Sequence, residues 1–140
     1  MRPAKLFTVE AANGLLPRLG YLVERLQDGA RRLHAELRDL AHTEGIDPDA
    51  LSTPELLRRR PGARRLVEEL DAIVHEIEEE GAELKDIQLG LVDFPAERDG
   101  QAILLCWQLG EPEVAFWHGP TDGFAGRRPL PHGARLPPLQ

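Results

Sequence analysis

Ionisable side chains gather where the apolar segments of the C-terminal half end. They are Asp93, Glu111, Glu113, His118, Asp122 and Arg127. One imidazole with two or three carboxylates can hold a divalent metal, or can pair a general base with an orienting acid. We expect Asp93 and His118 to converge across a small sheet, with Asp122 returning on the next loop. The candidate metal ligands are therefore His118, Asp93, Glu111 and Asp122, although their spacing matches no standard metal motif.

A structural interpretation of the same residues stays open. In it Asp93 caps a turn and His118 makes a local hydrogen bond. Arg127 also has two interpretations. It follows Gly123-Phe124-Ala125-Gly126, where glycines allow close backbone approach, so its guanidinium could bind an anionic ligand bidentately. The favoured alternative is an ion pair from Arg127 to Glu111 or Asp93 that locks this loop onto the sheet.

The tryptophans and the single cysteine lie in the most apolar segments. Trp107 and Trp117 fall on neighbouring expected strands, where core packing is favoured over a ring-lined ligand pocket. Cys106 precedes Trp107, so the two side chains point to opposite faces. We expect Cys106 to be a small buried hydrophobe rather than a nucleophile. A single cysteine also excludes an internal disulfide and a multi-cysteine zinc site.

Strand signals begin at Ile87 and define a three-stranded antiparallel meander. Asp99-Gly100 separates the segment 91–94 from the apolar run 102–109, and the turn 110–112 precedes a strand over 114–118. The middle run does not alternate polar with apolar residues, so both of its faces should be covered. The segment 82–130 is thus expected to be meander plus ordered loop, with 131–140 as a tail that frays from Arg135.

Residues 1–81 carry helical periodicity instead. Thr8 is the expected N-cap, and Pro17 should cause a kink or restart near Leu16. A leucine stripe then continues to about Thr43. An inserted loop over about 45–62 should contain a short helix capped by Ser52 or Thr53. A second apolar seam follows at Leu66, Leu70, Ile73, Ile77 and, past Gly81, Leu84.

Neither apolar stripe can remain in water, so the two helices should pack as a long antiparallel hairpin. The predicted fold class is α+β, with this hairpin on the small meander in a single domain over 1–140. A further apolar flank would face the C-terminal region or a second copy of the chain, which predicts a homodimer or a protein partner. Its members are Leu15, Val23, Val67 and Val74.

Several short strings resemble a known family when taken together. They are Phe7-Thr8, Leu15-Leu16-Pro17, Gly90-Leu91-Val92-Asp93-Phe94-Pro95-Ala96, Leu105-Cys106-Trp107, Gly110-Glu111, Trp117-His118 and Gly123-Phe124-Ala125-Gly126-Arg127. In this combination the chain resembles the prokaryotic domain of unknown function 2203 family over nearly its whole length. The segment from Ile46 to Arg60 is less characteristic. The resemblance implies no established activity, cofactor or catalytic residue, so roles must come from physical argument.

Composition limits the classes of function. The 140 residues suit one domain, and a net charge of −7 disfavours nucleic acid as a general partner. The only dense basic cluster, Arg58 to Arg65, is interpreted as a solvated face partly neutralised by Glu55, Glu68 and Glu69. No stretch is apolar enough to span a bilayer, and a reducing cytoplasm fits the cysteine content.

Two functions therefore stay open. The favoured one is a non-enzymatic module for protein interaction or oligomerisation through the helical hairpin. The alternative is a small-molecule or divalent-metal site around His118 in the C-terminal region, either binding only or enzymatic. The sequence does not decide whether the protein is an enzyme and identifies no cofactor beyond the divalent metal of that alternative.

Overall fold

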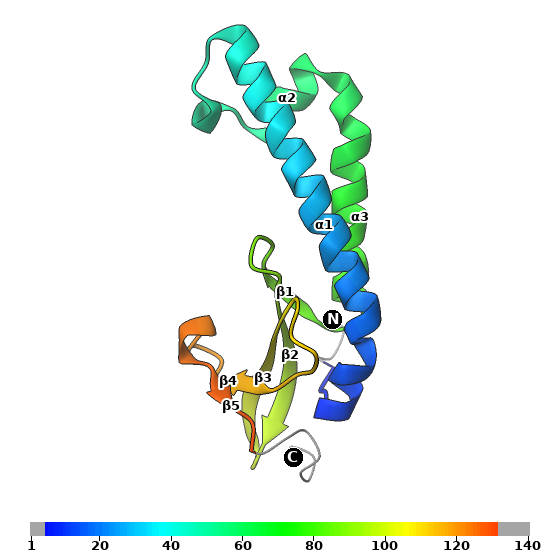
Figure 1. Ribbon diagram of the computed structural model, residues 1–140, viewed down its shortest axis with the longest axis vertical. Helices are drawn as coiled ribbons and strands as arrows, with labels where there is room; N and C mark the ends of the chain where they lie inside the picture. Colours follow the sequence, from blue (N-terminus) through cyan, green and yellow to red (C-terminus); the bar gives the residue numbers. More distant parts are fainter. Residues whose placement is uncertain (1–4, 132–140) are drawn as a thin grey trace.

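The computed structural model describes residues 5–131 as an α+β fold, in which a helical arm stands on one antiparallel sheet (Figure 1). The helices are α1 (Val9–Glu44), α2 (Thr53–Arg59) and α3 (Arg64–Glu79), with 3₁₀ turns η1 (Pro48–Ala50), η2 (Pro61–Ala63) and η3 (Phe124–Gly126). The strands are β1 (Glu83–Asp86), β2 (Leu91–Arg98), β3 (Gln101–Gln108), β4 (Phe116–His118) and β5 (Arg128–Pro129). The expected tail from Arg135 lies outside the described residues.

Helix α1 begins as the sequence predicts but does not stop at the proline. The side chain of Thr8 accepts a hydrogen bond from the Ala11 amide at 3.0 Å, which caps the first turn. The helix then continues through Pro17 for 36 residues, about 54 Å at 1.5 Å per residue, so the expected restart near Leu16 is wrong. Proline removes one helical hydrogen bond, and burial of Leu19 and Leu22 on the sheet side offsets that loss.

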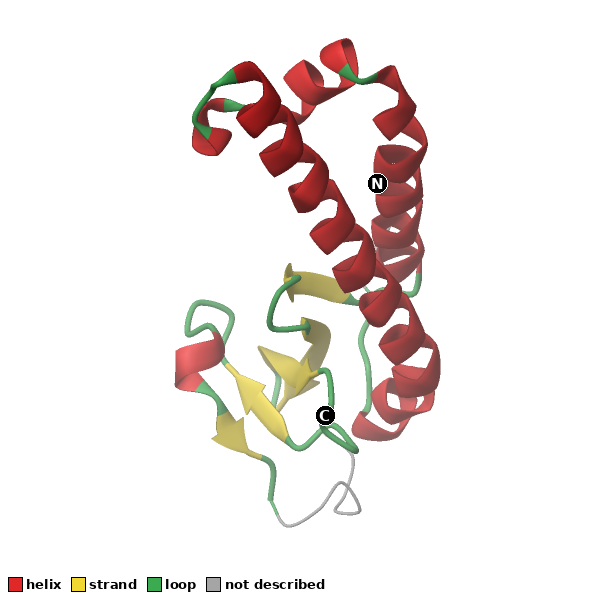
Figure 2. Cartoon of the chain, turned by 45° about the horizontal axis from the view of Figure 1, so that its top comes forward, coloured by secondary structure: helices red, strands yellow, loops and turns green. Residues whose placement is uncertain are grey.

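The second half of the arm is divided rather than a single rod. Ser52 caps α2, and α3 then runs back beside α1 in the opposite direction. Figure 2 shows α1 and α3 close together near the sheet and apart at the far end, where α2 lies between them. The expected antiparallel hairpin of two helices is therefore only partly right, because α2 is a third helix at its far end. Leu84 also leaves the helical seam, because α3 ends at Glu79 and Leu84 lies in β1.

The sheet has five antiparallel strands in the order β1-β2-β3-β4-β5, so the expected three-stranded meander is incomplete. The three expected strands correspond to β2, β3 and β4. Strand β1 escapes prediction because its sequence, Glu-Leu-Lys-Asp, is mostly polar. Strand β5 escapes prediction because it has only two residues, and it pairs Pro129 with Phe116. Both are edge strands, where pairing to a stronger neighbour replaces intrinsic propensity.

The two faces of the sheet have different coverings, which confirms that β3 is covered on both sides. Phe94, Leu105 and Trp107 project toward α1 and join the main core with Leu19, Leu22 and related residues. Cys106 projects to the opposite face and is also buried. A separate small cluster forms at the distal end of the arm, where Leu40, Leu56 and Ala63 are buried together.

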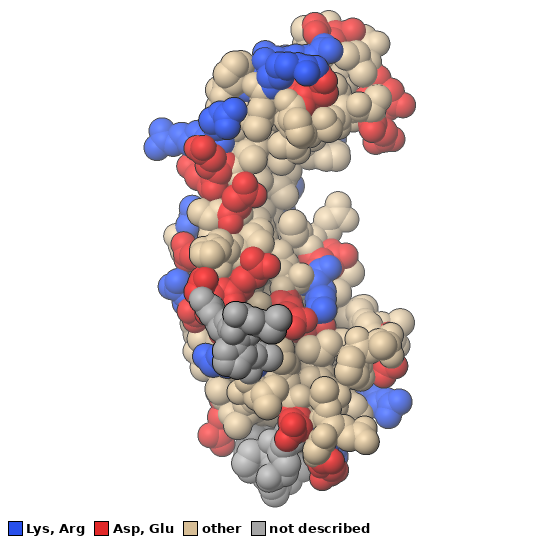
Figure 3. All heavy atoms as spheres, turned by 180° about the vertical axis from the view of Figure 1, so that it is seen from behind, with Lys and Arg blue, Asp and Glu red and all other residues tan. Residues whose placement is uncertain are grey.

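Charged side chains cover the arm in mixed signs. Figure 3 shows acidic and basic groups interleaved on the face turned away from the viewer in Figure 1. The Arg58 to Arg65 cluster is largely paired: Arg58 with Glu55, Arg59 with Glu44 and Glu55, Arg60 with Glu36 and Asp39, and Arg65 with Glu69. Within residues 5–131, no helix has the length and apolar character needed to cross a membrane.

Candidate metal centre

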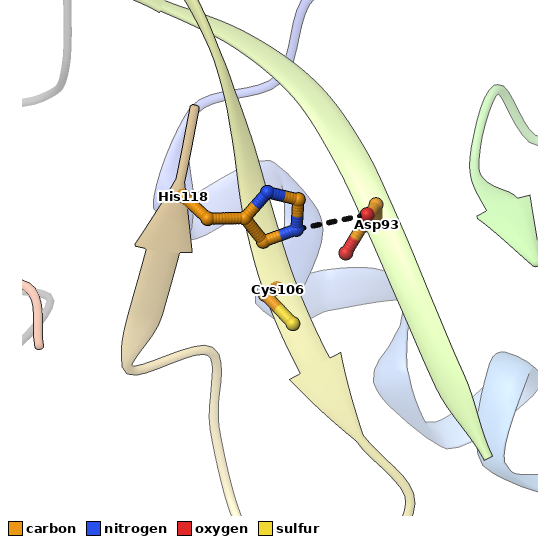
Figure 4. A group of neighbouring side chains, drawn as sticks. All are labelled: Asp93, Cys106 and His118. Atoms are coloured by element: carbon orange, nitrogen blue, oxygen red, sulfur yellow. Dashed lines mark hydrogen bonds and ion pairs between the residues drawn. The ribbon is translucent and has the colours of Figure 1, made fainter. Parts of the chain in front are cut away.

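Three adjacent strands place an acid, a thiol and an imidazole together on the sheet face opposite α1. Asp93 on β2 lies directly across from Cys106 on β3, and His118 on β4 pairs with Leu104, two residues from Cys106. All three side chains are buried and converge (Figure 4). Their ligand atoms lie within 4.8 Å of one another, and this is the group of potential metal ligands found among the described residues. The expected convergence of Asp93 and His118 is confirmed.

The hydrogen bonds of His118 fix which ring nitrogen faces the group. Nδ1 lies 2.8 Å from the carbonyl oxygen of Gly119, which can only accept, so Nδ1 carries a hydrogen and donates it. Nε2 then lies 3.0 Å from Oδ2 of Asp93. In metal-binding histidines, one ring nitrogen commonly donates a hydrogen bond to a backbone carbonyl or another acceptor while the other nitrogen faces the metal.

Burial controls the ionisation of the two other groups. It raises the pKa of Asp93 above its ordinary value, against the opposing influence of His118 and a hydrogen bond from Cys106. Burial also raises the pKa of the Cys106 thiol to about 12, and the nearby Asp93 carboxylate adds to this effect. Without a metal, the thiol is therefore protonated near neutral pH and is a poor nucleophile.

A small cavity of about 120 Å³ opens beside the three side chains. Its walls come from the sheet and from the loop that follows β4. Besides the cluster, the lining residues are Lys85, Leu91, Leu104, Pro120, Gly123 and Phe124. The loop after His118 thus covers the second face of the sheet, as α1 covers the first.

The structure does not bring Asp122 into the cluster. Its Oδ2 accepts a hydrogen bond from the Gly119 amide at 3.0 Å. The position is tight, because a Cβ on Gly119 would lie 2.7 Å from that oxygen and a Cβ on Gly126 would lie 2.6 Å from the Cβ of Asp122. Asp122 therefore organises the loop whose Gly119 carbonyl holds His118. Glu113 is exposed on a turn.

Glu111 and Arg127 form the ion pair that the sequence favours, at 2.7 Å, with side chains only 24% and 13% exposed. Glu111 Oε1 also accepts from the Gln108 amide. The guanidinium of Arg127 lies 4.0 Å from the ring centroid of Phe116 and 4.9 Å from that of Phe124. Since these contacts already engage both charges, Glu111 is turned away from the cluster and Arg127 fixes the covering loop.

The tryptophans lie on the other face of the sheet. Trp107 is buried in the main core, and its Nε1 donates to the Glu111 carbonyl at 2.9 Å. Trp117 is half-buried against the same core, and Arg98 and Arg128 lie over its ring. The core interpretation of both residues is confirmed, and neither lines the cavity beside His118.

The family comparison covers this whole region. A model described as an uncharacterized conserved protein, DUF2203, matches residues 5–130. The chain belongs to the DUF2203 family. This confirms the resemblance seen in the sequence, and all three clustered residues lie within the matched range of this DUF2203 protein. Searches of the curated proteins and of the solved structures gave no significant match.

Cys106 is the cluster member that the candidate set omits, although the sequence contains a signal for it. A two-residue hairpin turn at Asp99-Gly100 fixes the register, because Arg98 must then face Gln101. Counting back five more pairs along both strands places Asp93 opposite Cys106. The turn therefore does more than separate two strands, because its length also sets which side chains share a face.

Proposed function

We propose that this DUF2203 protein binds one divalent transition-metal ion of the zinc type through Asp93, Cys106 and His118. The observation that carries the proposal is the His118 ring, whose Nδ1 is held by the Gly119 carbonyl while Nε2 faces Oδ2 of Asp93, in a group whose three ligand atoms lie within 4.8 Å of one another. Metal–donor bonds of about 2.0 to 2.3 Å in tetrahedral geometry separate donor atoms by roughly 3.5 Å. Donor atoms within 4.8 Å of one another need only small side-chain rotations to reach that spacing.

The donor set favours a transition metal over magnesium or calcium. A thiolate and an imidazole suit Zn²⁺, Co²⁺ or Ni²⁺, whereas Mg²⁺ and Ca²⁺ need oxygen ligands. A metal also explains how Cys106 can act as a thiolate, because coordination displaces the thiol proton even when the pKa of the thiol in the free protein is about 12. A nucleophilic cysteine would instead need a lowered pKa and a base directed at its sulfur, but Nε2 of His118 faces Asp93.

Metal content tests the proposal directly. The purified chain, stripped with a chelator and reloaded with zinc, should hold one ion per chain by elemental analysis and should melt at a higher temperature than the stripped form. Cys106→Ser, Asp93→Asn and His118→Gln should each lose most of the bound zinc. The exposed His75→Gln variant is the matched control and should retain it. Equal zinc content in all five proteins, or none in the wild type, would refute the proposal.

Self-association through the helical arm is the second candidate function. A groove of about 320 Å³ runs between α1 and α3, lined in part by Tyr21, Leu66 and Leu70, and Tyr21 is 60% exposed. This candidate ranks second because α2 and η2 already cover the distal leucine stripe in their own buried cluster. Light scattering at micromolar concentration tests it: a dimer that Leu66→Glu converts to a monomer supports it, and a wild-type monomer refutes it.

A further inference from the structure

The strand geometry leaves one side of the proposed metal uncovered. Asp93, Cys106 and His118 rise from three adjacent strands on the same face of the sheet. Three donors that approach an ion from the sheet leave its remaining coordination position directed away from the sheet. The cavity of about 120 Å³ lies there, and all three residues line it.

No further protein donor completes the site among the described residues. The group of potential ligands contains three members. The other acidic candidates from the sequence are engaged elsewhere, Asp122 with the Gly119 amide and Glu111 with Arg127. Structural zinc sites have four protein ligands, whereas three protein ligands with one open position are typical of sites that bind an exchangeable molecule.

The walls of the cavity define the size and charge of that molecule. A volume of about 120 Å³ corresponds to roughly four water molecules. Within the part of the chain that the structure describes, Lys85 is the one lysine or arginine that lines the cavity. Its Nζ lies 3.0 Å from Glu83 Oε1, and both side chains are 45% exposed, so this pair lies at the solvent side.

We infer that the open coordination position is a binding site for small carboxylates of the size of formate or acetate, with Lys85 attracting the anion. The inference rests on the proposed metal centre. The metal would accept one carboxylate oxygen, and the Lys85 ammonium would stabilise the negative charge. Leu91, Leu104 and Phe124 give the organic part of the anion an apolar surface in a cavity of about 120 Å³, which favours a hydrogen atom or a methyl group over a larger group.

Cobalt-substituted protein provides the test, because sulfur-to-cobalt charge transfer reports metal binding and the visible d–d bands report changes in coordination. We expect formate and acetate to shift the d–d bands saturably, and benzoate to bind at least about tenfold more weakly because it does not fit. Lys85→Met should weaken acetate binding about two- to fivefold, as for a partly exposed ion pair, without changing cobalt affinity. Glu83→Gln should strengthen acetate binding by a similar factor, because it frees Lys85.

The outcomes separate the two proposals. If the protein shows the cobalt–thiolate band but its d–d bands do not change when formate or acetate is added, this inference is overturned and the metal centre is left intact. Equal responses to acetate and benzoate, or an acetate affinity unchanged in both Lys85→Met and Glu83→Gln, would overturn the assigned ligand class. Absence of the cobalt–thiolate band would overturn the metal centre and this inference together.

Discussion

Nε2 of His118 lies 3.0 Å from Oδ2 of Asp93, although the hydrogen of that imidazole is already used at Nδ1 by the Gly119 carbonyl. Two atoms that each present a lone pair do not approach so closely unless a proton or a cation lies between them. In the metal-free protein, one proton is therefore shared by this pair. A bound metal ion would take the place of that proton.

Metal binding should consequently release protons. One comes from the His118–Asp93 pair and a second from the Cys106 thiol, whose pKa of about 12 keeps it protonated in the metal-free protein. Release of two protons makes the apparent zinc affinity rise about 100-fold per pH unit while both groups stay protonated without metal. Calorimetry in two buffers of different ionisation enthalpy measures this number. A value near zero would contradict the arrangement, and His75→Gln should match the wild type.

Replacing Asp93 should separate stability from metal binding. Burial raises the pKa of Asp93, so the folded protein holds this proton more tightly than the unfolded chain does. The free energy of unfolding therefore falls as the pH rises from the pKa of Asp93 in the unfolded chain through its pKa in the folded protein. The whole loss of stability is present above both pKa values. In Asp93→Asn the new side-chain amide would stay neutral at every pH, and it could donate a hydrogen bond to Nε2 of His118.

We therefore expect metal-free Asp93→Asn to melt at or above the wild-type temperature near neutral pH, with any gain disappearing below about pH 4. Each kcal/mol gained would raise the melting temperature by roughly 2 to 4 °C in a domain of this size. Zinc should no longer stabilise the variant. Thermal melts from acidic to mildly alkaline pH check this, and a variant several degrees less stable at neutral pH but equally stable in acid would show that the ionised carboxylate stabilises the fold.

Asp122 should act as a positioning residue rather than a ligand. Its carboxylate holds the Gly119 amide, and the carbonyl of Gly119 holds His118. Loss of an outer partner of this kind usually weakens metal binding by about 10- to 100-fold. Asp122→Ala should show that loss in a zinc competition titration while still binding one ion. Asp71→Ala, on the exposed face of α3, is the control; complete loss of stoichiometric binding would instead make Asp122 a ligand.

The sequence predicts the candidate site better than the edges of the fold. Strand order is enough to bring Asp93 near His118, because a meander places their strands, β2 and β4, on either side of β3. Asp122 and Glu111 cannot be assigned in the same way. Their partners depend on loop conformation, in which Asp122 turns back to Gly119 and Glu111 turns to Arg127.

Pro17 and β1 show why tertiary contacts limit local prediction. The local cost of proline favours a helix break, but the surrounding apolar face of α1 is buried on the sheet and outweighs it. Strand β1 has little strand propensity of its own and exists because Leu84 pairs with Val92 on a strong neighbour. Neither outcome can be read from a window of sequence.

Arg127 should contribute to stability through the covering loop. Its guanidinium pairs with Glu111, donates to the Cys106 carbonyl at 3.4 Å and lies over the rings of Phe116 and Phe124. Removing a largely buried charge-assisted bond and this cation–π contact in Arg127→Leu should lower the free energy of unfolding by about 1 to 3 kcal/mol. Glu111→Gln should cost less, because the amide oxygen still accepts from Arg127.

A double-mutant cycle of Arg127→Leu and Glu111→Ala, in which each single variant removes the ion pair, isolates its contribution when followed by denaturant unfolding. A coupling of at least about 0.5 kcal/mol is expected for residues in direct contact. Arg31→Leu, at an exposed position of α1, is the control and should change stability by less than about 0.5 kcal/mol. If Arg127→Leu has no larger effect than Arg31→Leu, the loop is held by its glycine turns and Asp122 alone, and Arg127 would be free to serve an anionic ligand instead.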